Sequence, residues 1–197
     1  MLASYGLLGL IYLGFDVVRT RLMFPGCRLV RRPFYIRGRR WIVLGPGFTC
    51  GRGMRLDAFG HKSRKDPLIR IGSDVAINDY VHIGSVQSVT IGNRVLIASK
   101  VFISDHDHGG YGRKGVHTDP RIAPGERPLI AAPVVIGDDV WLGESVSVLA
   151  GARIGKGSVV GAMSTVTGDI PAYCIAVGSP ARVIKQFNFT NGIWERT

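Results

Sequence analysis

Cysteine is scarce in this chain: only three occur among 197 residues, and they stand far apart at Cys27, Cys50 and Cys174. They form no Cys-x-x-Cys pair, which argues against a zinc or dithiol redox site, and their odd number argues against a disulfide framework. Free thiols in a reducing compartment are the simplest expectation, so we expect a cytoplasmic protein.

The sequence also shows no pattern typical of a membrane-spanning segment or a secretory signal, and we expect neither. The apolar stretch at residues 2–15 is shorter than the roughly 20 residues that a span needs. It has no leading Lys or Arg and no small-residue cleavage site. It instead predicts a helix through about residue 23, ended near Pro25 and Gly26.

Acidic residues are nearly absent from residues 1–40, where Asp16 alone faces eight arginines. The formal net charge of +11 and the pI of about 10.1 therefore come mainly from one end of the chain, and we expect no nucleic-acid partner. An apolar helix followed by arginines suits peripheral contact with the anionic inner face of the cytoplasmic membrane. The alternative is that segment 1–40 packs on its own domain or on a neighbouring subunit.

What the chain has in abundance is glycine, 27 residues without a collagen-like period, and an aliphatic residue at every sixth position. No 3.6-residue period accompanies this repeat, which excludes amphipathic helices for the body of the chain. Weak hexads begin at Leu44. The twelve clearest hexads begin at Ile71, Ile77, Ile83, Ile91, Ile97, Ile103, Ile136, Leu142, Val148, Ile154, Val160 and Val166.

Because six is an even number, the first and fifth positions of each hexad lie on the same face of a strand. This pattern predicts an all-β solenoid, a parallel β-helix in which three hexads make one triangular coil of about 18 residues. We expect one domain at residues 41–187, preceded by the helical segment 1–40 and followed by a short cap or tail at 188–197.

The repeat has one long interruption, residues 104–133, which opens with Ser104-Asp105-His106-Asp107-His108. A loop this long in a compact domain usually has a function. A neutral histidine can take a proton from a hydroxyl group, so His106 and His108 are candidate general bases. Asp105 or Asp107 would orient a ring, or would serve as a turn residue. No cysteine is near, so direct attack in a ternary complex is favoured over an acyl-enzyme.

Three other segments carry a resemblance to a known family. They read IGSDVAINDYVHIG at residues 71–84, PVVIGDDVWLG at 133–143 and AVGSPARVIK at 176–185. They are similar to the hexapeptide-repeat acyltransferases, and most of all to sugar O-acetyltransferases of O-antigen and exopolysaccharide clusters. The resemblance implies a left-handed solenoid, a homotrimer with active sites between subunits, acetyl-CoA as co-substrate and no metal. Its register places the base seven residues after Val101, at His108, with His106 as the alternative.

The resemblance also implies binding residues. For the sugar acceptor, the nearest match to a sugar-contacting Asn is Asn78, with Asp79 and His82 beside it and Asp57 as a weaker candidate. Outward-facing wall residues are the alternative. One departure is Gly168, where the family often has Lys or Arg. The residues expected to bind CoA are Trp141, Gly143, Ala162, Thr167, Arg182 and Lys185.

These observations predict an acetyl-CoA-dependent O-acetyltransferase that modifies a sugar hydroxyl in a surface-polysaccharide precursor. A lipid-linked acceptor would explain membrane proximity, whereas a free sugar or antibiotic would not require it. A second class is a γ-carbonic-anhydrase-like metal-dependent lyase, with ligands from His82, His106 or His108, and His117. A third is a non-catalytic trimerising solenoid.

Overall fold

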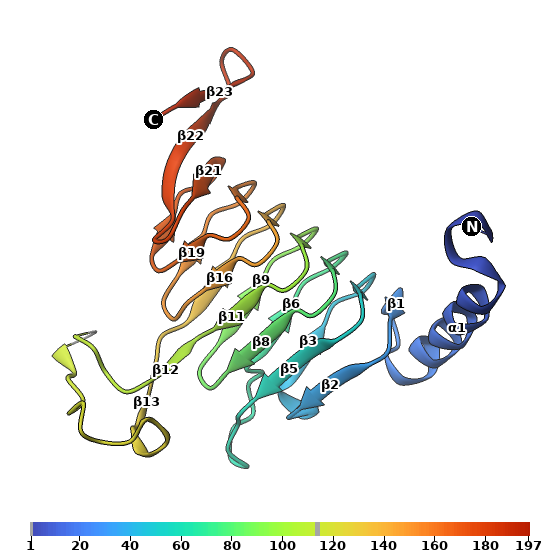
Figure 1. Ribbon diagram of the computed structural model, residues 1–197, viewed down its shortest axis with the longest axis horizontal. Coiled ribbons are helices and arrows are strands. Elements are labelled where there is room, and N and C mark those ends of the chain that lie inside the picture. The colour runs from blue at the N-terminus through green and yellow to red at the C-terminus, as the bar shows by residue number, and fades with distance from the viewer. Residues whose placement is uncertain (1, 113–114) are drawn as a thin grey trace.

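The computed structural model describes residues 2–112 and 115–197 and shows a solenoid with three flat faces, followed at one end by a helix and at the other by a hairpin (Figure 1). Each face is a sheet whose neighbouring solenoid strands are parallel. Trp141 pairs with Val159 in the next coil, so the coil length is the three hexads that the repeat predicts. The predicted solenoid is confirmed.

The strands divide among the faces as follows. Face A contains β1 (Leu29–Val30), β4 (Thr49–Cys50), β7 (Ala76–Ile77), β10 (Leu96–Ile97), β15 (Trp141–Leu142), β18 (Val159–Val160), β21 (Cys174–Val177), β22 (Arg182–Asn188) and β23 (Ile193–Arg196). Face B contains β2 (Phe34–Arg37), β5 (Met54–Ala58), β8 (His82–Ser85), β11 (Phe102–Ser104), β16 (Ser147–Val148) and β19 (Thr165–Val166). Face C contains β3 (Ile42–Leu44), β6 (Ile69–Ile71), β9 (Val89–Ile91), β14 (Val134–Ile136), β17 (Arg153–Ile154) and β20 (Asp169–Ile170).

The core is the stack of aliphatic residues that begin the hexads, all twelve of which are buried. The glycine that often follows has a steric cause. A Cβ added to Gly143 would lie 2.6 Å from the backbone nitrogen of Ala162 in the next coil, too close for any side chain. The fourth position of many hexads is a left-handed corner, as at Asp74 and Asp139, which the spacing alone did not predict.

The N-terminal helix α1 (Leu2–Met23) ends where the sequence predicts, and it contacts β1. The solenoid, however, begins earlier than residue 41, because β1 and β2 already pair with β4 and β5. The 3-10 turn η1 (Arg39–Trp41) follows β2. All three cysteines are free, as expected.

The C-terminal segment is an antiparallel extension of face A. β22 turns back on β21, and β23 turns back on β22, so residues 193–196 are a strand rather than a loose tail. Phe187 contacts both Phe189 and Trp194 edge to face across this hairpin.

The interruption leaves the solenoid after Ser104 and forms a two-stranded ribbon, β12 (His106–His108) with β13 (Leu129–Ala131). The ribbon projects from the body of the molecule, and the 3-10 turn η3 (Pro124–Glu126) lies within its loop (Figure 1). The chain rejoins the solenoid at β14. The interruption of the repeat therefore lies where the sequence predicts it, but its first and last residues form a regular antiparallel ribbon.

Candidate active site

Two histidines, each beside a buried carboxylate, converge beside Gly84 of β8, a central strand of face B. A Cβ built on Gly84 would lie 3.5 Å from Cε1 of His106 and 3.9 Å from Nε2 of His82. Both rings thus approach the same bare stretch of backbone. The neighbouring pairs place Asp57 next to Gly84 and Ser104 on its other side.

The first pair joins His82 to Asp57. Nε2 of His82 lies 3.1 Å from Oδ2 of Asp57, whose side chain is only 1% exposed. Nε of Arg55 donates to the same oxygen at 2.6 Å. Burial lowers the pKa of His82, against the raising effect of its hydrogen bond to Asp57. This ring is therefore neutral near pH 7, with Nε2–H as the donor to the carboxylate.

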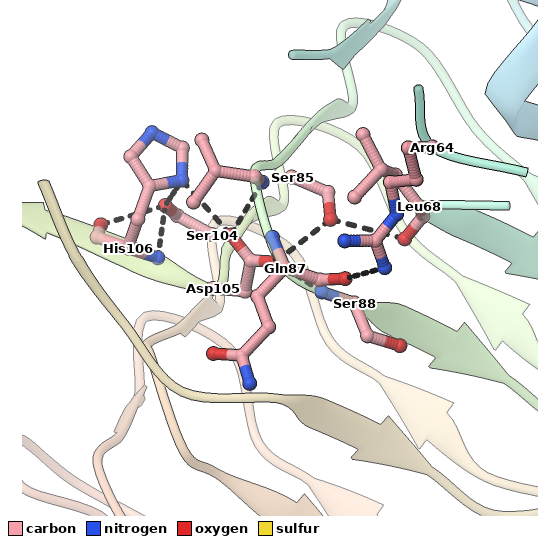
Figure 2. Close-up of polar contacts among 9 residues, drawn as sticks. Arg64, Leu68, Ser85, Gln87, Ser88, Ser104, Asp105 and His106 are labelled. Carbon is pink, nitrogen blue, oxygen red and sulfur yellow. Dashed lines mark hydrogen bonds and ion pairs between the residues drawn. The ribbon is translucent and has the colours of Figure 1, made fainter. Parts of the chain in front are cut away.

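The second pair joins His106 to Asp105 (Figure 2). Nδ1 of His106 lies 3.0 Å from Oδ1 of Asp105, and the ring is mostly buried. A ring that donates Nδ1–H to a carboxylate keeps its other nitrogen, Nε2, as an acceptor. Phe59 contacts the same ring edge to face, with 5.9 Å between ring centroids.

Asp105 also organises the backbone around it (Figure 2). Its carboxylate accepts the hydroxyl of Ser85 and the N–H groups of Val86, Gln87 and Ser88 at 2.6–2.9 Å. Burial alone raises the pKa of Asp105, but the hydrogen bonds from His106, Val86, Ser85 and Gln87 outweigh it and hold the pKa below its ordinary value. Asp105 thus fills both of the roles that the sequence left open, orienting a ring and stabilising a turn.

His108 lies on the same face of β12 as His106, because the two are separated by one residue of a strand. Its side chain is exposed, and within residues 2–112 and 115–197 it has no hydrogen-bond partner. His106 is the inner histidine and His108 the outer one. Asp107 lies between them on the opposite face of the strand.

Asn78 and Asp79 lie at a different corner, where face A turns toward face B. They line a cavity of about 310 Å³ together with Cys50 and Ser99. Oδ1 of Asp79 accepts the backbone N–H of Arg52, while Asn78 is exposed. Of the four predicted acceptor residues, His82 and Asp57 are brought to His106, and Asn78 and Asp79 are not.

The predicted CoA residues gather mainly on face A. Trp141 is half exposed and occupies a cross-strand row with Val159, Ile175 and Lys185. Gly143 follows β15 and lies against Ala162, which follows β18 in the next coil. Arg182 lies in β22, where it pairs with Val177 of β21. Thr167 is separate, since it follows β19 of face B, two strands away from β11, after which the histidine ribbon leaves. In one protomer, therefore, Trp141 and the histidines lie on different faces.

Sequence reasoning missed the arginine and aromatic side chains that surround the acceptor end of the site. Arg37 lies 3.6 Å from Asp57, and its guanidinium contacts the rings of Tyr35 and Phe59. The guanidinium of Arg55 also contacts Tyr35. The available signal was spacing: Arg55 and Asp57 stand two apart in one strand, and so share a face.

Nucleophile and metal candidates are few in the part of the chain that the structure covers. Burial raises the pKa of Cys50 to about 11, partly offset by its backbone hydrogen bond from Arg31, so this thiol stays protonated. No group of three or more His, Cys, Asp or Glu among the described residues is arranged to hold a metal ion. His117 pairs with Tyr111 in the projecting loop.

Comparison with known proteins decides the family. Residues 133–168 match the model of the bacterial transferase hexapeptide (six repeats). WbbJ of Escherichia coli (strain K12), assigned as an O-acetyl transferase of lipopolysaccharide biosynthesis, is 48% identical over 192 residues, covering 98% of this chain and 95% of WbbJ. The chain belongs to the hexapeptide-repeat acetyltransferases. It is an enzyme of that family, and its solenoid is left-handed.

Two solved structures of hexapeptide-repeat acetyltransferases share the fold. A maltose O-acetyltransferase from Clostridium difficile 630 is 28% identical, with a TM-score of 0.60 and coverage of 76% of this chain and 72% of that one. An acetyltransferase from Vibrio cholerae O1 biovar eltor, complexed with acetyl coenzyme A, is 26% identical, with a TM-score of 0.51 and coverage of 86% and 74%. Membership of this family sets aside the lyase and the non-catalytic solenoid.

Proposed function

We propose that the chain transfers the acetyl group of acetyl-CoA to a hydroxyl group of a saccharide in a surface-polysaccharide precursor. The observation that carries this proposal is the similarity to WbbJ along nearly the whole of both chains. Acetyl-CoA as donor is supported by the acetyl-CoA complex of the Vibrio relative. A saccharide acceptor is supported by WbbJ and by the maltose enzyme.

In the proposed mechanism a histidine of β12 accepts the proton of the acceptor hydroxyl. The hydroxyl oxygen attacks the thioester carbonyl carbon, the C–S bond breaks, and the CoA sulfur leaves with the proton returned by the imidazolium. We assign this role to His108. It is the family's position by register, and its exposed ring has both nitrogens available to a ligand. His82, Asp57 and the inner His106 would then bind the acceptor.

One observation favours His106 as the base instead. Its hydrogen bond to Asp105 fixes the ring and leaves Nε2 to accept a proton, as in a catalytic triad. Direct transfer is favoured in either case, because the buried thiol of Cys50 stays protonated and lies away from the histidines.

We further propose a homotrimer. The ribbon histidines follow β11 of face B, whereas Trp141 and Lys185 lie on face A, so one protomer does not bring donor and base together. A second copy that packs face A beside the ribbon of the first would complete the site, and closed cyclic symmetry would repeat it three times. The projecting ribbon is suited to reach such a neighbour.

The same proposal includes peripheral association with the membrane. Among the residues that the structure describes, no helix is long and apolar enough to span a bilayer. We place the enzyme in the cytoplasm, held peripherally at the inner face of the cytoplasmic membrane by segment 1–40, where a lipid-linked acceptor would be met.

The decisive test is incubation of the purified protein with acetyl-CoA and candidate saccharides, both free and lipid-linked, with mass spectrometry of the acceptor. Gain of one acetyl group with release of CoA supports the proposal. Release of CoA without acetylation of any saccharide, or acetylation of an amine alone, would overturn it.

A further inference from the structure

A pocket separate from the histidine site lies between α1 and the first coil. It has a volume of about 570 Å³. Its lining combines three arginines with one acid and two rings: Tyr12, Asp16, Arg19, Arg32, Pro33, Phe34 and Arg52. With three guanidinium groups against one carboxylate, the pocket carries excess positive charge.

The hydrogen bonds in the pocket leave part of this charge uncompensated. Asp16 is shared, because its Oδ1 lies 3.0 Å from Nε of Arg32 and 3.5 Å from Nη2 of Arg19. Nη2 of Arg19 donates to the carbonyl of Val30 at 2.9 Å, whereas Nε is buried without a partner among the described residues. Burial first, and then repulsion from Arg32, lower the pKa of Arg19. The guanidinium of Arg52 forms no ion pair with an acid among the described residues. A bound anion with several oxygens would satisfy these donors.

The outer surface of α1 beside this pocket is apolar. Five side chains spaced by three or four residues form one stripe, and each is between 48% and 79% exposed: Leu7, Ile11, Phe15, Val18 and Leu22. Tyr12 and Arg19 project from the flank of the same helix, where the pocket opens. A soluble surface rarely exposes such a stripe unless something covers it.

We propose that α1 lies on an anionic lipid bilayer, with its apolar stripe in the interface and the phosphate of a lipid headgroup in the α1–coil pocket. The apolar stripe would contact the acyl chains, and the arginines beside it would contact the anionic headgroups. The inference rests on the proposed function only in placing the enzyme at the membrane. It adds a defined phosphate site that takes no part in acetyl transfer.

The test is cosedimentation of the full chain with vesicles of phosphatidylcholine alone or mixed with phosphatidylglycerol. The pocket variant is Arg32→Gln with Arg52→Gln. The matched control is Arg70→Gln with Arg153→Gln, which removes the same charge from the outer surface of face C. We expect wild type and control to bind the mixed vesicles equally and the pocket variant to bind about thirtyfold more weakly, since each basic group at the leaflet contributes about fivefold.

Other outcomes would overturn the proposal. Equal losses in the pocket and control variants would mean that net charge alone drives binding. Protection of wild type by inorganic phosphate against heat, without vesicle binding, would assign the pocket to a free anion. A changed oligomeric state in Ile11→Ser with Phe15→Ser would mean that a second copy covers the stripe. Circular dichroism confirms folding of each variant. Acetyl transfer to a free saccharide is measured in parallel, so failure of catalysis and failure of membrane binding are told apart.

Discussion

Oδ1 of Asp105 lies 3.0 Å from Nδ1 of His106, and the same carboxylate accepts the backbone N–H groups of residues 86–88. One side chain therefore fixes the inner histidine and the turn between two faces of the solenoid. Loss of Asp105 is expected to disturb stability as well as catalysis, and the two effects can be separated.

We predict that Asp105→Ala destabilises the protein by about 3 kcal/mol, because the buried hydroxyl of Ser85 and three partly buried N–H groups lose their acceptor, at about 1 kcal/mol or more each. The depressed pKa of Asp105 gives a pH signature. Its ionised form stabilises the fold fully above the ordinary value of 3.8, and this contribution is lost as pH falls through the lower, folded pKa. The free energy of unfolding, measured with urea, should therefore fall more steeply toward acid pH in wild type than in Asp105→Asn. Parallel pH dependences of the two proteins would contradict the assignment.

The two ribbon histidines are separated by single substitutions. We expect His108→Ala to lower kcat by about 10²–10⁴-fold, the range for loss of a general base, with the melting temperature unchanged because the side chain is exposed. His106→Ala should raise KM for the acceptor with a smaller effect on kcat. The reverse pattern would make His106 the base. Steady-state kinetics on the two variants give the answer.

The environment of His82 can be tested by NMR titration of its ring. Burial lowers its pKa and the Asp57 hydrogen bond raises it, so the midpoint should lie below the ordinary 6.5 in wild type. In Asp57→Asn the raising effect is lost while Arg55 still repels the imidazolium, so the midpoint should move lower again. A midpoint that rises in this variant would show that the hydrogen bond is absent in solution.

Glycine at the second hexad position is expected to be irreplaceable where coils abut. Gly143→Ala would force a Cβ to within 2.6 Å of the next coil's backbone and should lower the melting temperature markedly. Gly168→Ala is the matched control, because its Cβ would meet nothing within 4 Å. We expect this control to change stability by less than about 0.5 kcal/mol. Equal melting temperatures for the two variants would contradict the close approach.

A shared active site predicts complementation between inactive variants. His108→Ala removes the histidine of one protomer, and Trp141→Ala removes the face A contact of the other. In mixed trimers about one site in three combines an intact ribbon with an intact face A, so coexpression should restore activity that neither variant has alone. Mass measurement by light scattering would first establish the trimer. No recovery in verified mixed trimers would place the whole site within one chain.

The sequence predicts the scaffold well because its signal is local and repeated. A residue such as Ile97 lies in the core through spacing alone, and every coil adds an independent instance. The site is less accessible, because its contacts cross coils. Nothing in the spacing ties Asp105 to the turn at residues 85–88, or Arg37 to Asp57. The separation of Asn78 from the histidines reflects a corner between faces, which a linear pattern does not locate.

The geometry of the ribbon's base has a consequence for how this enzyme can change. The backbone N–H of Ala132 donates to the carbonyl of Asp105 at 2.8 Å, so the chain leaves and re-enters the coil at adjoining points. Residues 106–131 are therefore an insertion that does not interrupt the stacking of the coils. Both ribbon histidines lie at the start of this segment, so the part that follows His108 is the part that can change in length while the hydrogen bonds of every coil stay in register.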